Sequence, residues 1–222
     1  MPAALIPRPS TRPAEGAVHL PDWLDVARQR RLVTACREWS SGAGPGHPGM
    51  QAVRLPGGGL MSVRMMCLGW HWYPYGYSRE VCAGVPVPPL PDWLADLGRR
   101  AVADAYRDEA AAAGYQPDVA LINFYDESAR MGLHQDRDER SAAPVVSLSL
   151  GDIGMFRFGN TEGRGRPWTD IELHSGDLFV FGGPSRFAFH GVTKILPGTG
   201  DPDIGLPRGR LNITLRVSGR PQ

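Results

Sequence analysis

The sequence lacks the long uncharged apolar run that a membrane helix requires, so we expect no membrane-spanning segment. Its start, MPAALIPRPSTRPAEG, lacks the basic, then apolar, then small-residue order of a secretory signal, and we expect residues 1–16 to form a flexible arm. Cysteine is scarce: Cys36, Cys67 and Cys82 are the three present, and none forms a Cys-x-x-Cys pair. This odd, unpaired set favours reduced thiols in a cytoplasmic protein.

An excess of charge of one sign is also lacking. Lysine plus arginine number 24 against 23 acidic residues, so the net charge gives no bulk electrostatic argument for a nucleic-acid partner. Lysine itself is almost absent, because Lys194 is the only one. The remaining cations are arginines, which bind planar carboxylates and phosphates through two parallel N–H groups.

Two amphipathic segments predict helices. The first covers residues 22–39 with Asp22 as its cap, and the second covers residues 92–113, capped by Asp92 and ended by Gly114. Between them we expect a loop at 40–49, a turn at 56–59, a strand at 60–68, no regular structure at 69–77 and a rigid linker at 85–91.

After residue 114 the pattern changes to short β-rich runs separated by Gly, Pro, Asn and Asp. We expect strands at 119–125, 144–150, 154–159, 170–174, 177–182, 186–192 and 210–217. Such a series is typical of a β-sandwich or barrel. We therefore predict a mainly β, α+β fold in a single domain over 17–222, with a lid-like portion at 17–90 and a core at 91–222.

A histidine and a carboxylate lie one residue apart in LHQD, at His134 and Asp136. Alternate residues of an extended chain point the same way, so both side chains could face one metal ion. Two imidazoles and one carboxylate form the ligand set of iron(II) oxygenases, and His190 is a candidate third ligand. A lone His-x-Asp pair is weak evidence, and a histidine beside Phe187 and Phe189 is more often packed in a core. The other histidines, which have no second ligand at useful spacing, are interpreted as surface, loop or supporting residues: His19, His47, His71 and His174.

The segment RLNITLR places polar residues on one face of a predicted strand and Leu211, Ile213 and Leu215 on the other. A solvent-exposed polar face is the simple interpretation. Two arginines at the ends of that face are instead suited to a dicarboxylate, because each can bind a carboxylate through two hydrogen bonds. The polar residues are Arg210, Asn212, Thr214 and Arg216, with Asn123 and Tyr125 on a nearby strand.

Together these motifs resemble the AlkB-type Fe(II)- and 2-oxoglutarate-dependent dioxygenases, which repair alkylated nucleic acids. The resemblance covers roughly residues 55–217 and rests on PGGGLMSV, LGW…GY, QPDVALINFY, LHQDRDE, PVVSLSLG, FRFG, SGDLFVFGGPSRFAFHGV and RLNITLR. It implies a double-stranded β-helix (jelly-roll) with a nucleotide-recognition lid. It also implies oxidative demethylation of bases such as 1-methyladenine or 3-methylcytosine in DNA, and possibly in RNA, with release of formaldehyde and succinate.

The resemblance assigns roles to individual residues. His134, Asp136 and His190 would bind Fe(II), and Arg210 would bind the distal carboxylate of 2-oxoglutarate. Arg216 would lie at its other end, close to the metal. The remaining hydrogen bonds to the co-substrate would come from Asn123, Tyr125 and Asn212, with Ser147, Ser149 and Thr214 lining or supporting the pocket.

The resemblance also implies a set of substrate contacts. Trp70 would stack on the flipped-out base, Tyr77 would touch phosphate or the lid, and Asp138 would lie near the exocyclic amine of the lesion. Arg130 and Met61 would border the same site. Departures from the family pattern fall in this region: Gly59 replaces a lid aromatic, the segment 61–70 is short, Phe181 replaces a tryptophan, and the loop 160–168, with Arg164 and Arg166, differs.

Three functions remain open from the residues. The chain is a demethylase of alkylated bases, preferring single strands and acting as a monomer; or a 2-oxoglutarate oxygenase of tRNA, a protein or a small molecule; or a non-catalytic binding module on a jelly-roll scaffold. An intact iron and co-substrate motif favours the first two.

Overall fold

The computed structural model describes residues 7–42 and 47–221 of the 222-residue chain. Its larger sheet has eight antiparallel strands, in the order β1-β2-β14-β11-β16-β9-β4-β3. Their bounds are β1 Thr11–Ala14, β2 Ala17–Leu20, β3 Gln51–Arg54, β4 Leu60–Leu68, β9 Val119–Tyr125, β11 Val145–Gly151, β14 Leu178–Phe181 and β16 Arg210–Arg216.

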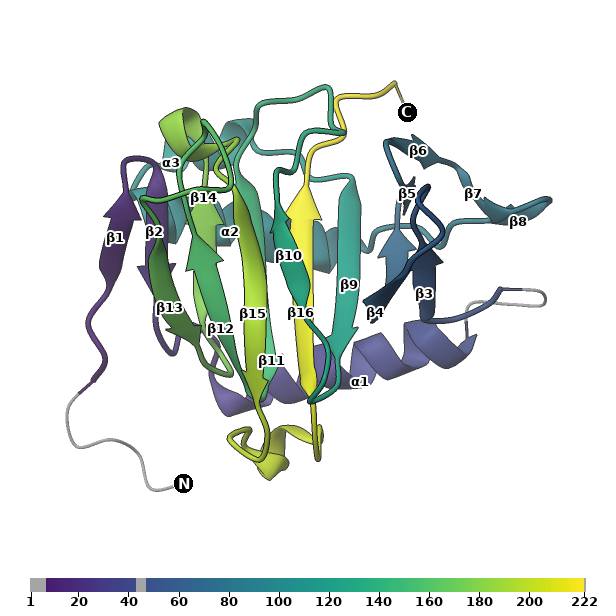
Figure 1. Cartoon of the computed structure of the whole chain (residues 1–222), viewed down its shortest axis with the longest axis horizontal. Coiled ribbons are helices and arrows are strands. Elements are labelled where there is room, and N and C mark those ends of the chain that lie inside the picture. Colours follow the sequence, from purple (N-terminus) through teal and green to yellow (C-terminus); the bar gives the residue numbers. More distant parts are fainter. Residues whose placement is uncertain (1–6, 43–46, 222) are drawn as a thin grey trace.

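A second sheet of four strands lies in front of the first in the view of Figure 1, in the order β10-β15-β12-β13. Its strands are β10 Met131–His134, β12 Ile153–Phe158, β13 Thr169–Leu173 and β15 His190–Leu196. Two small hairpins, β5 His71–Tyr73 with β6 Gly76–Ser78 and β7 Glu80–Cys82 with β8 Val85–Pro86, lie beside the β3–β4 end. The antiparallel sheets are those of a jelly-roll, which confirms the predicted fold class.

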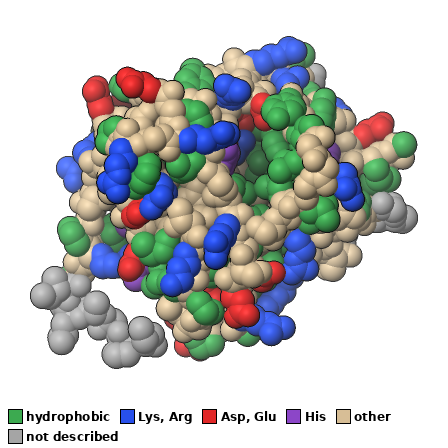
Figure 2. Space-filling view, in the orientation of Figure 1, with side chains coloured by type: hydrophobic (Ala, Val, Ile, Leu, Met, Phe, Trp, Pro, Cys, Tyr) green, Lys and Arg blue, Asp and Glu red, His purple; other side chains and the backbone are tan. Residues whose placement is uncertain are grey.

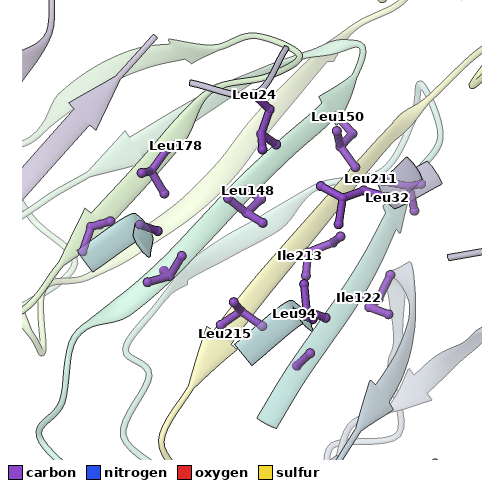
Figure 3. Packing of buried hydrophobic residues seen from close by; sticks show 14 of the residues in the cluster. Leu24, Leu32, Leu94, Ile122, Leu148, Leu150, Leu178, Leu211, Ile213 and Leu215 are labelled. Atoms are coloured by element: carbon purple, nitrogen blue, oxygen red, sulfur yellow. The ribbon is translucent and has the colours of Figure 1, made fainter. Parts of the chain in front are cut away.

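Three helices cover the outer face of the larger sheet: α1 Val26–Gly42, α2 Asp92–Tyr106 and α3 Glu109–Gly114. Alternate residues of the central strands point toward these helices, as the parallel rows of side chains in Figure 3 show. The main core joins Leu148 and Ile213 of the sheet to Leu32 of α1 and Leu94 of α2, all at most 1% exposed. Within the described residues, no helix is long and apolar enough to span a membrane.

The other face of the larger sheet points toward the smaller sheet. An aromatic cluster fills part of this space, and Phe179 lies 5.0 Å from Phe156 between ring centroids. The rest is polar, because every residue of β16 is buried, including the face that carries Arg210, Asn212, Thr214 and Arg216. Burying such a row costs free energy unless its polar atoms find partners. This interior polar face is what positions the site.

Both predicted helix caps were wrong. Asp22 has a left-handed backbone (φ 54°) and donates its amide to Asp177, so α1 begins later, with the Asp25 carboxylate accepting the Arg28 amide. Asp92 is the first residue of α2 and not its cap. The predicted second helix is broken at Arg107, whose φ of 55° ends α2. The side chain of Asp108 then caps α3, which ends at Gly114 as predicted.

Other predictions missed short hairpins between strands that are adjacent in the sequence. Residues 11–14 of the expected flexible arm form β1, and Arg8 makes an ion pair of 2.6 Å with buried Asp177, whereas residues 1–6 lie outside the described residues. The aromatic stretch 69–77 and the proline-rich stretch 85–91 contribute strands to the two hairpins. The run 186–192 becomes strand only at His190, which begins β15.

Candidate metal centre and co-substrate pocket

Three potential metal ligands meet at the mouth of the barrel. His134 is the last residue of β10 and His190 the first of β15, and the antiparallel register places them directly opposite one another. Asp136 follows β10 by two residues. One ligand atom from each of these side chains lies within 4.8 Å of the others, so together they could hold a single metal ion.

Hydrogen bonds prepare both imidazoles for this role. Nδ1 of His134 lies 2.9 Å from the Gly132 carbonyl, and Nδ1 of His190 lies 2.9 Å from the Ala188 carbonyl. Because a carbonyl only accepts, each Nδ1 carries the proton and each Nε2 keeps its lone pair. These Nε2 atoms lie 3.5 Å and 3.6 Å from the carboxylate of Asp136. Burial lowers the pKa of His190, which favours its neutral, ligating form.

The carboxylate of Asp136 is held by an arginine on one side only. Arg216 Nη2 lies 2.7 Å from Oδ1, whereas Oδ2 is buried without a partner in the described structure. Burial alone would raise the pKa of Asp136, but the charge of Arg216 opposes it, and the pKa lies well below its ordinary value. An ionised carboxylate with an unpaired oxygen, close to two imidazole lone pairs, fits a divalent cation.

A buried ionic network supports Arg216 from behind. Its Nη1 lies 2.9 Å from Glu139, and Glu139 also accepts hydrogen bonds from Arg186 at 3.0 Å and from the Tyr77 hydroxyl. Arg186 further donates to the backbone carbonyl of Asp136 at 2.5 Å. The metal-ligand segment is therefore fixed through both its side chain and its backbone.

Arg210 is a buried cation of a different kind, since no carboxylate pairs with it in the described structure. It donates to the Ser149 hydroxyl at 2.8 Å and to the Leu173 carbonyl at 3.1 Å, and its Nε has no partner. Gly154 leaves room for the guanidinium, because a Cβ there would lie 2.8 Å from Nε. Burial lowers the pKa of Arg210 to about 10. Since buried charges are normally paired, this arginine fits an anionic ligand that enters the pocket.

The pocket between Arg210 and the three metal-ligand candidates is lined by both sheets, with its polar side chains on β9, β11 and β16 of the larger sheet and further lining residues on β15. Cross-strand register places Tyr125 beside Arg210, Asn123 beside Asn212, and Ser147 beside Thr214. Asn123 Oδ1 is buried without a partner in the described structure, while Asn212 donates to Ser147 at 2.7 Å. Every residue predicted for iron or 2-oxoglutarate lines this pocket: Asn123, Tyr125, His134, Asp136, His190, Arg210, Asn212 and Arg216. Phe181, where a tryptophan was expected, packs 4.9 Å from His190 between ring centroids.

A much wider cleft, of about 1020 Å³, opens in front of the pocket and shares His134, Asp136 and Arg216 with it. In Figure 2 the molecular surface is hollowed, and the hollow is bordered by apolar (green) and basic (blue) side chains, with a histidine side chain (purple) visible at its edge. Of the predicted substrate contacts, Met61, Arg130 and Asp138 line the cleft, as does Arg164. Arg166 instead lies over the ring of Trp168, 4.8 Å from its centroid.

Two predicted substrate contacts do not face the cleft. Trp70 is buried and donates its indole N–H to Asp118 at 3.1 Å. Tyr77 is buried, and its hydroxyl is hydrogen-bonded to Glu139. The sequence reasoning overlooked Trp72, which lines the cleft, and Glu139, although both occur in motifs that carry the resemblance. Neither residue had a local signal in the sequence, because the ion pairs of Glu139 with Arg186 and Arg216 join distant segments.

A jelly-roll with two imidazoles and a carboxylate at its mouth, backed by a buried arginine, defines a mononuclear iron(II) oxygenase that uses an anionic co-substrate. Residues 16–216 match the 2OG-Fe(II) oxygenase superfamily. The chain belongs to this superfamily and to its AlkB-type group, and it is an Fe(II)- and 2-oxoglutarate-dependent dioxygenase that consumes O₂. Family membership, enzyme class and cofactors are thus confirmed as predicted.

Individual relatives support this placement. An alpha-ketoglutarate-dependent dioxygenase AlkB homolog of Caulobacter vibrioides is 40% identical over 203 residues, which cover 88% of this chain and 84% of the relative. The DNA N(6)-methyladenine demethylase ALKBH1D of Arabidopsis thaliana is 33% identical over 227 residues, covering 90% of this chain and 49% of the relative. The solved structure of OsALKBH1 has a TM-score of 0.77 and 33% identity, and the match covers 93% of this chain and 99% of that one.

Proposed function

We propose that this enzyme removes N-linked methyl groups from bases of nucleic acid by oxidation. The observation that carries the proposal is the wide cleft over the metal-ligand candidates, which has aromatic, apolar and arginine side chains on its walls. An aromatic wall suits a planar base, and arginines suit the phosphates beside it. Relatives named as AlkB dioxygenase and as DNA N(6)-methyladenine demethylase add support.

In this proposal His134, Asp136 and His190 hold the iron. Arg210 binds the distal carboxylate of 2-oxoglutarate, because it is buried and lacks an anionic partner in the described structure. Arg216 keeps Asp136 ionised and lies near the other end of the co-substrate. Further hydrogen bonds to the co-substrate come from the pocket-lining polar side chains, which are Asn123, Tyr125 and Asn212.

Iron(II), 2-oxoglutarate and O₂ together supply the oxidation: one oxygen atom enters the N-methyl group, and the other enters succinate as CO₂ leaves. The hydroxymethyl product then loses formaldehyde, and the base nitrogen regains its hydrogen or electron pair. The chain's own contribution is geometric. It orients the imidazoles through Gly132 and Ala188, fixes Asp136 through Arg216, and holds the co-substrate through Arg210.

A base inside a duplex cannot reach the bottom of this cleft, so the target has to be unpaired or turned out of its stack. We propose single-stranded DNA as the preferred substrate, with RNA as a further one, and a monomeric enzyme. Arg130 and Arg164 on the cleft wall would meet backbone phosphates. A cytoplasmic location fits the three free cysteines.

The test is a demethylation assay with Fe(II), ascorbate, 2-oxoglutarate and single-stranded oligonucleotides that each carry one 1-methyladenine, 3-methylcytosine or N6-methyladenine. We expect loss of one methyl mass with an equal amount of succinate, faster on single strands than on matched duplexes. His134→Ala is the control and should give neither product.

Two results would contradict the proposal in different ways. Succinate formation without demethylation of any oligonucleotide would support the oxygenase activity but reject these substrates. It would favour tRNA, a protein or a small molecule as the substrate. An iron-loaded protein that makes no succinate under any condition would favour a binding module.

A further inference from the structure

Asp177 is a buried carboxylate outside the co-substrate pocket, in the turn that joins β13 to β14. Arg8, which precedes β1, donates to both of its oxygens, at 2.8 Å to Oδ2 and at 2.6 Å to Oδ1. His19 donates to the same carboxylate at 2.9 Å, and so does the backbone amide of Asp22 at 3.0 Å. One carboxylate therefore ties the segment before β1 to a turn 169 residues away in the chain.

Asp177 is linked through the backbone to both groups that hold the guanidinium of Arg210. Arg210 donates to the Leu173 carbonyl at 3.1 Å and to the Ser149 hydroxyl at 2.8 Å. Leu173 is the last residue of β13, and the Asp177 side chain accepts the amide of the next residue, His174, at 2.9 Å. The Asp177 carbonyl accepts the Ser149 amide at 3.0 Å. Fixing Asp177 therefore fixes both acceptors of Arg210.

Asp177 also acts on Arg210 through its charge. Burial lowers the pKa of Arg210, whereas the charges of Tyr125 and Asp177 act in the opposite direction. An unpaired carboxylate near Arg210 would repel a dianion such as 2-oxoglutarate, and salt screens buried charges only weakly. Arg8 offsets this repulsion, because its guanidinium is held against the fully buried Asp177 side chain. The positive charge of Arg210 is thus left for an incoming anion.

We propose that Arg8 is a positioning residue of the 2-oxoglutarate site. Its pairing with Asp177 fixes the turn that holds Arg210 and offsets a negative charge that would repel the co-substrate. The proposal rests on the part of the proposed function that assigns the distal carboxylate of 2-oxoglutarate to Arg210. It does not depend on which base or which nucleic acid is demethylated. The segment before β1 thereby belongs to the catalytic unit, although Arg8 lies outside the pocket.

The proposal predicts weaker 2-oxoglutarate binding without a change in metal binding. In metal sites, loss of an outer partner of a ligand costs about 10- to 100-fold, and we expect Arg8→Gln to raise the Kd for 2-oxoglutarate roughly 10-fold. Arg8→Lys, which keeps the charge but loses the two parallel donors, should give a smaller rise. Asp22→Asn is the matched control, because the exposed Asp22 carboxylate binds the same arginine. It keeps the backbone amide that binds Asp177 and should leave the Kd unchanged.

The experiment uses the full chain loaded with Mn(II). Binding of 2-oxoglutarate is measured by calorimetry for wild type, Arg8→Gln, Arg8→Lys, Asp22→Asn and Arg210→Lys. Affinity for Mn(II) alone is measured in parallel and should be equal in wild type and the Arg8 variants. Succinate formation by the Fe(II)-loaded protein then separates KM from kcat. Arg8→Gln should raise the KM for 2-oxoglutarate and leave kcat at saturation unchanged, which a loss of folded protein would not do.

A wild-type Kd in folded Arg8→Gln, together with a raised Kd in Arg210→Lys, would overturn this proposal and leave the proposed function intact. A wild-type Kd in both variants would reject the role of Arg210 in the proposed function, and this proposal with it. A lowered kcat with unchanged KM would show that Arg8 is only structural. If Arg8→Gln does not fold, Arg8→Lys decides: a raised Kd supports the proposal and a wild-type Kd refutes it.

Discussion

Arg216 holds Asp136 by one oxygen and leaves the other unused: Nη2 lies 2.7 Å from Oδ1, and Oδ2 is buried without a partner in the described structure. This asymmetry fixes the rotation of the carboxylate and aims the unpartnered oxygen at the side of His190, whose Nε2 lies 3.6 Å away. An arginine is suited to this task because it stays charged when buried.

Asp136→Asn should abolish metal binding while the protein stays folded. The amide oxygen can still accept from Arg216, but the anionic ligand is lost. We expect Mn(II) affinity, measured by calorimetry with 2-oxoglutarate present, to fall more than about 100-fold. Asp170→Asn, at an exposed ion pair with Arg157, is the control. Wild-type affinity in Asp136→Asn would remove this residue from the ligand set.

Arg210→Lys should raise the 2-oxoglutarate requirement and leave metal binding largely intact. Lysine keeps the charge but loses the planar pair of donors, and a hydrogen bond to a charged group contributes about 1.5–3 kcal/mol. The KM for 2-oxoglutarate should therefore rise roughly 10- to 150-fold. Arg157→Lys, outside the pocket, should leave it unchanged. An unchanged KM in Arg210→Lys would show that the distal carboxylate binds elsewhere.

Glu139→Ala should destabilise the protein strongly. Glu139 is the carboxylate shared by Arg186 and Arg216, and its removal leaves two buried guanidinium groups short of a partner. Breaking a buried ion pair from one side costs about 3–5 kcal/mol. The free energy of unfolding in urea measures the effect. Exposed Glu127→Ala should change it by less than about 0.5 kcal/mol, and an equally small effect of Glu139→Ala would refute the role of the network.

Asp177 should make stability depend on pH in the acid range. Burial would raise its pKa, but hydrogen bonds from His19, Arg8 and backbone amides outweigh it and lower the pKa from 3.8 to about 2. The folded state thus favours the carboxylate, so this stabilisation is complete above pH 3.8 and is lost as the pH falls toward 2.

Asp177→Asn should accordingly lower the free energy of unfolding by about 2 kcal/mol at pH 7, and the difference from wild type should shrink below pH 4. Thermal unfolding between about pH 2 and 7 measures it, with exposed Asp92→Asn as the control. A difference that stays constant with pH would contradict the assignment.

The three cysteines should differ in reactivity. Cys82 is exposed, whereas Cys36 and Cys67 are buried. Burial raises the pKa of Cys36 to about 12 and that of Cys67 to about 11, so neither forms the reactive thiolate near neutral pH. Iodoacetamide at pH 8 should label only the Cys82 peptide, as read by mass spectrometry, until denaturant is added. Early labelling of Cys36 would mean that α1 opens readily.

The parts of the site that follow from local periodicity were predictable from the sequence. The alternation in RLNITLR put Arg210 and Arg216 on one face of a strand, and the structure has both on the face that lines the pocket. The strand at residues 60–68 and the end of α3 at Gly114 were likewise placed correctly. His190 was only a candidate third ligand from the residues, because no spacing rule connects it to His134, and the resemblance assigned it that role.

The errors arose where distant contacts decide the structure. Residues 71–78 form a hairpin in which Trp72 lines the cleft, whereas Trp70, just before it, is buried beside Met65, and nothing in the aromatic run specifies which ring is covered. Glu139 and Arg186 are 47 residues apart, so their ion pair has no local signature. Residues 11–14 became a strand because β2 offers an edge to pair with, which outweighs their proline content.

β10 lies at the edge of the four-stranded sheet, next to β15, with His134 at its end. An edge strand has unpaired backbone N–H and C=O groups on one side, so it can pair with the strands of other chains. A metal ion bound by residues of β10 and β15 would link these two strands and stabilise their pairing, because a ligand that binds only the folded state stabilises that state. The supply of iron would then determine the lifetime of the folded protein as well as its catalytic rate.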